Sequence, residues 1–225
     1  MEPRIVFEDR ELAVVYKPPG MESQESRDFT EDMVSFLKKH WRQEYVGVIH
    51  RLDKPVEGLL LAARTPQAAS ALSRDLQNKK IEKTYEALTL GIPKEKRARL
   101  FDYLKKDARG SLQDVVSEKE AGAREMALEY QLLNSKYVGE HQLARLSIRL
   151  ETGRRHQIRL QCAAHGFPLL GDRRYNPGAQ PQGVPAALTE NVALCGCSLS
   201  FMHPKTKKNM TFKISPSWEE VWKKI

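Results

Sequence analysis

The sequence predicts an α+β domain with a mixed, largely antiparallel central sheet flanked by helices and loops. Short apolar runs typical of strands occur as consecutive pairs separated by turn residues, and about three stretches with helical spacing lie between the pairs. Strands that follow one another as hairpins favour an antiparallel sheet, and the intervening helices make the class α+β. We expect residues 1–225 to form a single domain, in which two lobes could share the sheet.

The first forty residues predict a hairpin and a helix. Residues 5–7 and 12–16 are apolar runs separated by charged residues, and two prolines end the second strand because they donate no ladder hydrogen bonds. Residues 30–41 have apolar side chains at helical spacing, so one face of this helix should be buried. The apolar positions are Met33, Val34, Leu37 and Trp41.

The next segment predicts two strands, a helix and a third strand. Residues 46–49 and 59–63 are apolar runs of β type joined by a broad polar loop. Thr65 suits the N-cap of a helix and the proline after it suits the first helical position, so a helix should run to about Asn78. Residues 81–90 then indicate a strand that contains Tyr85.

The second half predicts further hairpins around one helix. Residues 126–134 and 142–150 alternate partly and indicate a hairpin, whereas residues 100–124 indicate loops and a short strand. Residues 156–165 have helical spacing, with a glycine placed to end the helix. Residues 171–190 lack an apolar period and predict a long mobile loop. Two closing strands and a short final helix are expected at residues 192–200, 210–214 and 217–222.

The charge balance makes a polyanion the first partner to consider. Lys and Arg number 37 against 29 acidic residues, which gives a net charge of +8 and a pI near 9.4. Neutralising phosphates releases counterions, so a basic chain favours nucleic acid, although a generic basic surface would have the same composition. The basic residues cluster at 79–80, 94–99, 105–106, 154–155, 173–174 and 205–208.

Composition also excludes several classes of protein. No run approaches the roughly 18 apolar residues of a membrane helix, and the start of the chain lacks the pattern of a secretory signal. Three cysteines argue against a disulfide framework and favour a reducing cytoplasm. Cys162, Cys195 and Cys197 lack, with the histidines, the paired spacing of a zinc site, so no metal is expected.

The most informative stretch is residues 47–64, where the broad loop carries Arg51 and Asp53. Two strands can place such a pair accurately for chemistry, although an ordinary surface hairpin with a solvated ion pair has the same pattern. His50-Arg51-Leu52-Asp53, followed by Gly-Leu-Leu-Leu at 58–61, resembles the signature motif of the pseudouridine synthases of the RluA branch. In that motif the aspartate is the catalytic nucleophile.

Other segments resemble the same family in the same order. Lys83-Thr84-Tyr85 is similar to the second motif of the family, and residues 152–159 with 166–175 are similar to the third. Residues 5–20 resemble the opening segment of the family and residues 201–204 its closing segment. The resemblance covers nearly the whole chain. It implies the pseudouridine synthase fold, with a catalytic domain that lacks the extra small RNA-binding domain of many relatives.

The resemblance implies an enzyme that isomerises uridine in RNA without a metal or a cofactor. Asp53 would be the nucleophile, either forming an ester-like adduct or assisting loss of a ribose proton, and the sequence does not choose between these routes. Arg159 would keep the Asp53 carboxylate ionised. Tyr85 would stack on uracil and serve in proton transfer at C5.

The resemblance also implies how RNA is held. The target nucleotide must swing out of its stack, and Arg51 would fill the space that it leaves. Arg154, Arg155, Arg173 and Arg174 are the other candidate RNA contacts. We expect a cytoplasmic protein, a monomer by default, that recognises the shape and a splayed loop of ribosomal or transfer RNA. The sequence identifies neither the RNA nor the uridine.

One departure from the family pattern lies beside the signature motif. Val56-Glu57 stands where Thr-Ser is common, and an added negative charge near Asp53 could repel phosphate or raise the pKa of the aspartate. This departure puts the choice of substrate in doubt more than activity. It also leaves open a non-catalytic RNA-binding protein that keeps the fold and has lost the chemistry.

Overall fold

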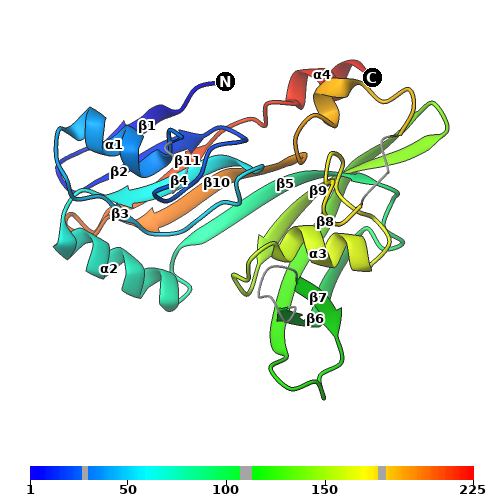
Figure 1. Ribbon diagram of the computed structural model, residues 1–225, viewed down its shortest axis with the longest axis horizontal. Helices are drawn as coiled ribbons and strands as arrows, with labels where there is room; N and C mark the ends of the chain where they lie inside the picture. Colours follow the sequence, from blue (N-terminus) through cyan, green and yellow to red (C-terminus); the bar gives the residue numbers. More distant parts are fainter. Residues whose placement is uncertain (27–29, 107–112, 177–180) are drawn as a thin grey trace. The chain divides into compact units, whose positions relative to one another are not determined.

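The computed structural model describes residues 1–26, 30–106, 113–176 and 181–225 (Figure 1). The chain divides into two compact units. The first comprises Met1–Lys83 and Cys195–Pro216, and the second comprises Thr84–Leu194 and Ser217–Ile225. Each unit is therefore built from two separate stretches of the chain.

The sheet of the first unit is mostly antiparallel. The predicted first hairpin is confirmed as β1 (Arg4–Glu8) and β2 (Leu12–Lys17), and β2 also pairs with β4 (Glu57–Ala63). The short strand β3 (Gly47–Val48) pairs antiparallel with β4, which confirms the two strands predicted at residues 46–49 and 59–63. Strand β10 (Leu194–Met202) pairs with β4 in parallel orientation. Its pair with β11 (Asn209–Lys213) is antiparallel.

Two helices complete the first unit, and both begin at a side-chain cap. Helix α1 (Met33–Trp41) starts three residues later than the predicted range of 30–41, because the Asp32 carboxylate caps it by accepting the N–H groups of Val34 and Ser35. Helix α2 (Pro66–Gln77) begins as predicted, with Thr65 Oγ1 accepting the N–H of Ala68.

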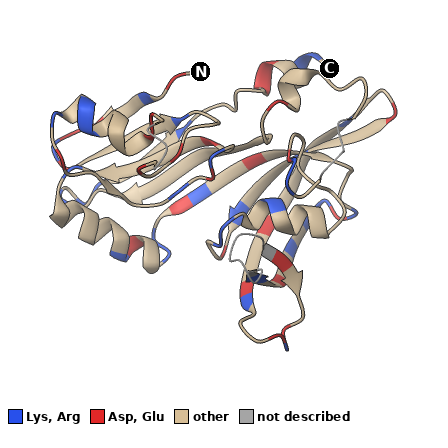
Figure 2. Cartoon of the chain, in the orientation of Figure 1, with Lys and Arg blue, Asp and Glu red and all other residues tan. Residues whose placement is uncertain are grey.

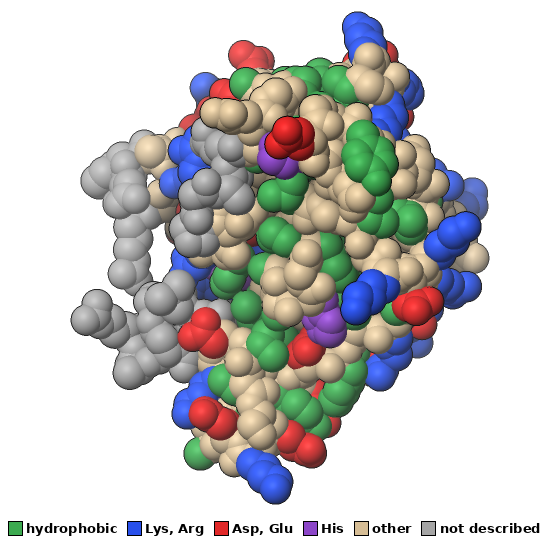
Figure 3. Space-filling view, turned by 90° about the vertical axis from the view of Figure 1, so that its right-hand side faces the viewer, with side chains coloured by type: hydrophobic (Ala, Val, Ile, Leu, Met, Phe, Trp, Pro, Cys, Tyr) green, Lys and Arg blue, Asp and Glu red, His purple; other side chains and the backbone are tan. Residues whose placement is uncertain are grey.

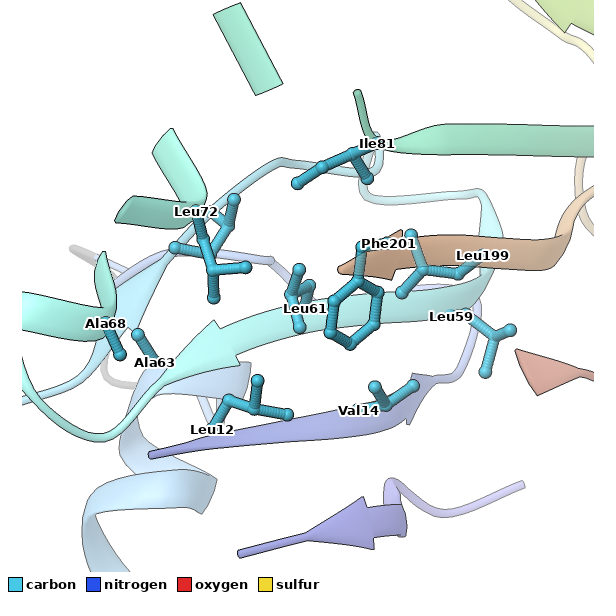
Figure 4. Close-up of a cluster of buried hydrophobic side chains, with 11 residues drawn as sticks. Leu12, Val14, Leu59, Leu61, Ala63, Ala68, Leu72, Ile81, Leu199 and Phe201 are labelled. Atoms are coloured by element: carbon cyan, nitrogen blue, oxygen red, sulfur yellow. The ribbon is translucent and has the colours of Figure 1, made fainter. Parts of the chain in front are cut away.

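Side chains from β2, β4, β10 and α2 meet in one apolar cluster of the first unit (Figure 4). Alternate residues of each strand point into the cluster, which is the period expected of a strand that packs on a helix. The same cluster includes the side chain just before β5. Its labelled members are Leu12, Val14, Leu59, Leu61, Ala63, Ala68, Leu72, Ile81, Leu199 and Phe201.

In the described part of the second unit, five strands pair in antiparallel order. Along the sheet lie β5 (Glu82–Leu90), β9 (His141–Leu150), β8 (Arg124–Val138), β6 (Arg97–Lys106) and β7 (Gln113–Val116). The predicted hairpin of β8 and β9 is confirmed; towards the turn, β8 runs four residues further than expected and β9 one residue further. Every described pair of this sheet is antiparallel, in keeping with the predicted fold class.

The expectation of loops with a short strand over residues 100–124 is wrong in part: the short strand is β7 and turns follow it, but a long strand was missed. Strand β6 is ten residues long and pairs with both β7 and β8. Its Leu100 and Leu104 are buried, whereas Arg99 and Phe101 are exposed. A strand with one solvated face carries charges at alternate positions, and these charges concealed the apolar period.

Between and after these strands, the described residues of the second unit include two short helices and a 3₁₀ turn. Helix α3 (Gln157–Ala164) confirms the predicted helix, and Gly166 ends it with a φ of 83°. Helix α4 (Glu219–Lys224) confirms the predicted final helix. The long loop expected over 171–190 is wrong in part: Ala186–Leu188 form a 3₁₀ turn, and Leu188 is buried in an apolar cluster, while residues 177–180 lie outside the described residues.

Candidate active site

The loop between β3 and β4 carries Asp53 and is anchored on both sides of that residue. On one side, Ser23 Oγ donates to the Leu52 carbonyl (2.8 Å) and accepts the Leu52 N–H (3.1 Å). On the other side, the Lys54 carbonyl accepts the Gly20 N–H (2.7 Å). Asp53 itself is half-buried. The segment after β2 therefore holds both neighbours of Asp53, which restricts where its carboxylate can lie.

Lys17, the last residue of β2, is fully buried beside this loop. Its Nζ donates to three backbone carbonyls at 2.8–3.2 Å, those of Pro18, Met21 and Lys54. Burial lowers the pKa of Lys17 to about 8, while the carboxylates of Asp53 and two glutamates oppose that shift. A positive charge thus acts on Asp53 from within the first unit. The sequence did not indicate this role, because a lysine before Pro-Pro-Gly carries no sign of burial.

Glu57, the residue that departs from the family pattern, is buried at the start of β4. Its Oε2 accepts the Tyr16 hydroxyl at 2.6 Å. Burial and the neighbouring Glu57 carboxylate raise the pKa of Tyr16. Glu57 also acts on Lys17, whose pKa it raises. Because Glu57 is 3 % exposed, its carboxylate acts on these buried neighbours. It cannot contact a phosphate at the protein surface directly.

The two residues before Leu52 differ in their surroundings. His50 is buried, and its Nε2 accepts the Leu61 N–H at 3.3 Å. Burial, with the positive charge of Lys83, lowers the pKa of His50 to about 3, so the imidazole is neutral and holds β4. Arg51 is exposed, and its Nη1 donates to Gln24 Oε1 at 3.3 Å.

Helix α3 of the second unit carries Arg159, whose guanidinium binds a carboxylate inside the same unit. Nε donates to Asp172 Oδ2 (2.7 Å) and Nη2 donates to Asp172 Oδ1 (2.8 Å). The two side chains are 6 % and 1 % exposed. Asp172 was not among the predicted site residues, although it lies within the third motif. The neighbouring Arg173 and Arg174 were predicted as RNA contacts because they are positively charged. The sequence does not show that Asp172, between them and the third-motif helix, is buried.

Tyr175 lies against the same guanidinium. The Arg159 Cζ is 5.3 Å from the centre of its ring, and Arg174 Cζ is 5.9 Å from it. The Tyr175 hydroxyl is 2.9 Å from His156 Nδ1. Burial and the surrounding arginines lower the pKa of His156 to about 3, so this histidine is neutral and its Nδ1 can accept a hydrogen bond from the Tyr175 hydroxyl. Arg159 is therefore enclosed by Asp172 on one edge and an aromatic ring on one face.

The predicted catalytic residues divide between the two units. Asp53 lies in the first unit, whereas Tyr85 and Arg159 lie in the second. Tyr85 is 5 % exposed on β5, where it pairs across the sheet with Ile148. These placements leave the roles of the three residues as predictions.

The candidate RNA contacts are all surface residues. The five arginines at positions 51, 154, 155, 173 and 174 are exposed. Figure 2 shows further basic positions on most elements, interleaved with acids. On the face shown in Figure 3, Lys and Arg lie mainly towards the edges and hydrophobic side chains gather nearer the middle. Basic residues therefore surround that face and do not form one continuous patch on it.

Cysteines and histidines form no recognisable metal centre in the described residues. Cys162, Cys195 and Cys197 are buried free thiols. Across the described ranges, no group of three or more His, Cys, Asp and Glu side chains is arranged to hold a metal ion. Within those ranges, none of the helices has the length and apolar character needed to cross a membrane.

Comparison with known proteins identifies the family. The family model described as RNA pseudouridylate synthase matches residues 11–164, a range that contains Asp53, Tyr85 and Arg159. The chain belongs to the RNA pseudouridylate synthase family. The predicted family, its RluA branch and the enzyme class, an isomerase, are thereby confirmed, and RNA is the substrate class.

Relatives of this synthase family span most of the chain. An uncharacterized RNA pseudouridine synthase of Aquifex aeolicus is 32% identical over 93% of this chain and 68% of its own length. The ribosomal large subunit pseudouridine synthase D of Vibrio cholerae is 31% identical, and the chain spans 65% of that relative. The tRNA pseudouridine synthase C of Vibrio cholerae is 29% identical, with 97% of this chain and 92% of the relative covered.

Solved synthase structures confirm the fold. Human RNA pseudouridylate synthase domain containing 1 superposes on 96% of this chain with a TM-score of 0.77 at 21% identity, covering 84% of that chain. Human RNA pseudouridylate synthase domain containing 4 gives a TM-score of 0.74 at 19% identity, covering 96% of this chain and 90% of that one. The predicted α+β pseudouridine synthase fold is confirmed. Nothing in these comparisons favours the non-catalytic alternative.

Proposed function

We propose that this chain converts specific uridines of ribosomal or transfer RNA to pseudouridine, with Asp53 as the nucleophile. The observation that carries the proposal is the Asp53 loop, tied on one side by Ser23 and on the other by Gly20 and Lys17. A carboxylate whose neighbours are fixed in this way is preorganised for attack, and the match to the signature motif assigns it that role.

The reaction breaks the N1–C1′ bond, turns the base and joins C5 to C1′. The proton leaves C5 and N1 gains one, so the isomerisation needs no outside oxidant or cofactor. Asp53 would either attack the sugar or assist loss of a ribose proton. Arg159 would keep that carboxylate charged, with Lys17 as a second cation, and Tyr85 would stack on the base and move the C5 proton.

RNA would be held by exposed cations around an extruded nucleotide. Arg51 is exposed beside Asp53 and would fill the space that the nucleotide leaves. The exposed pairs at 154–155 and 173–174 would bind phosphates. The named relatives act on large-subunit ribosomal RNA and on tRNA, so both remain candidates, read through RNA shape and a splayed loop. We also propose a monomer in the cytoplasm, where the buried thiols would stay reduced.

The decisive test compares the natural chain with Asp53→Asn on RNA labelled with tritium at C5 of uridine. Release of tritium by the natural chain, and none by Asp53→Asn with unchanged RNA binding, is the expected result. Asp75→Asn in α2 is the matched control and should release tritium normally. Equal binding with no release from either chain would favour the RNA-binding alternative.

A second test identifies the target. Ribosomal and transfer RNA from a strain lacking the gene would be mapped for pseudouridines. We expect one or more positions to be missing, and the purified chain should restore them in that RNA. A complete set of pseudouridines in the deletion strain would count against the proposal.

A further inference from the structure

Asp172 and Arg159 form a buried bidentate pair that the family motif does not itself explain. Both contacts are short, 2.7 Å and 2.8 Å, and both side chains are almost fully enclosed. A buried pair of this kind is costly to desolvate and needs good geometry on both sides. An arginine on the solvent-facing side of α3 would be solvated by water and would need no buried partner.

The Asp172 carboxylate is itself held in place. Its Oδ1 accepts the backbone N–H groups of Arg174 (3.0 Å) and Tyr175 (3.3 Å). Burial would raise the pKa of Asp172, but Arg159 and these N–H groups outweigh it and keep the pKa below its usual value. The carboxylate is therefore an ionised acceptor, and the backbone turn that follows Gly171 holds it in one position.

The ion pair with Asp172 fixes the direction in which the remaining N–H donors of the Arg159 guanidinium point. A guanidinium has five N–H donors in a fixed plane, and Asp172 takes the Nε donor and one Nη2 donor along one edge. The donors of Nη1 and the second donor of Nη2 must then face away from Asp172. The Tyr175 ring, 5.3 Å from Cζ, limits rotation of the plane.

We propose that Asp172 is a positioning residue that aims the outward donors of Arg159 at the reacting carboxylate or the substrate. This inference rests on the proposed function, because it gives Arg159 its catalytic task. Without Asp172 the arginine can reach other staggered rotamers, and its charge is no longer delivered to one place. Tyr175 and its contact with His156 support the same orientation.

The test measures kcat and KM for tritium release in Asp172→Asn and Asp172→Glu. We expect Asp172→Asn to lower kcat by about 10- to 100-fold, the scale of a misplaced catalytic group, with KM unchanged. Asp172→Glu keeps the ion pair but shifts the guanidinium by one methylene, so it should recover part of the loss. If Asp172→Asn does not fold, Asp172→Glu decides: a wild-type kcat in that variant would overturn the proposal.

Two further variants separate this inference from the proposed function. Asp102→Asn is the matched control, since Asp102 accepts hydrogen bonds from Gln161 and His165 at the other end of α3, and its kcat should stay normal. In an Arg159→Lys background, Asp172→Asn should cost little more, because the two residues act as one unit. Losses that multiply would overturn the positioning role. Wild-type activity of Arg159→Lys and Arg159→Ala would instead overturn the role proposed for Arg159.

Discussion

Glu57, which departs from the family pattern beside the signature motif, is accommodated by a buried hydrogen bond from Tyr16. The Tyr16 hydroxyl donates to the Glu57 carboxylate at 2.6 Å, and both side chains are buried. A carboxylate in this place needs a donor and a nearby cation, which Tyr16 and Lys17 supply. The sequence alone marked Glu57 as a charge near Asp53 and could not show which way that charge faces.

Tyr16→Phe should destabilise the protein. The change leaves the buried carboxylate with one hydrogen bond fewer, so we expect the free energy of unfolding to fall by about 1–3 kcal/mol. Urea denaturation measures the loss. Tyr137→Phe is the matched control: Tyr137 is 69 % exposed, and its hydroxyl accepts from Gln142, so its loss should stay within about 0.5 kcal/mol. Equal losses in the two variants would contradict the role assigned to the buried pair.

Gly58→Ala should be far more damaging than its size suggests. Gly58 has a φ of 141°, and an added Cβ would lie 2.5–2.7 Å from backbone atoms of Gly196 on β10. Backbone in a paired strand cannot yield as a side-chain tip can, so we expect a loss of about 3 kcal/mol or more in urea unfolding.

The comparison for Gly58→Ala is a glycine with positive φ in open space. Gly122 has a φ of 83° and nothing within 4 Å of an added Cβ. Gly122→Ala should therefore cost only the conformational strain, about 1–2 kcal/mol. If the free energy of unfolding falls by the same amount in both variants, the close approach of β4 and β10 does not explain the loss in Gly58→Ala.

The start of α2 and the end of α3 were predicted correctly from local residues, whereas the start of α1 was missed by three residues. Thr65 with the following proline predicted where α2 begins, and the structure confirms that cap. Strand β6 was missed, because alternate charges on its solvated face look like a loop when its partner strands are unknown. Caps depend on residues a few positions apart, whereas a strand depends on a partner that can lie anywhere in the chain.

Asp32→Ala should destabilise α1. The Asp32 carboxylate accepts the N–H groups of Val34, Ser35 and Ser26 and the Ser35 hydroxyl at 2.9–3.1 Å. Losing this cap should cost about 1–2 kcal/mol in urea unfolding. Thr65→Ala, which removes a single 3.2 Å bond to Ala68, should cost less, and the reverse order would be incompatible with this account.

At the scale of the whole molecule, stability should depend on pH through buried neutral histidines. His50 and His156 have pKa values lowered from 6.5 to about 3. Below pH 6.5 the unfolded chain binds protons that the folded chain does not, so the free energy of unfolding should fall as pH falls from 6.5 towards 3. Asp172, whose pKa is lowered, adds its own loss only below the ordinary aspartate value of 3.8.

Urea unfolding at pH 6.5 and at pH 4.5, the ordinary pKa values of His and Glu, checks this dependence. His156 faces Arg155, Arg159, Arg174, Asp172 and the Tyr175 hydroxyl. His156→Gln keeps an acceptor for that hydroxyl but cannot titrate, so its stability should change less between the two pH values. An identical slope in the variant would mean that His156 is protonated in the folded chain.

The sequence by itself determined the family, the fold class, the hairpins and most of the helices, because these depend on motifs and on periods that local residues carry. Only the tertiary structure decided that Lys17 is buried against the Asp53 loop, that Ser23 holds Leu52 and that Asp172 holds Arg159. Burial and pairing arise when distant segments meet. A charged side chain therefore looks the same in the sequence whether it ends in solvent or in a buried ion pair.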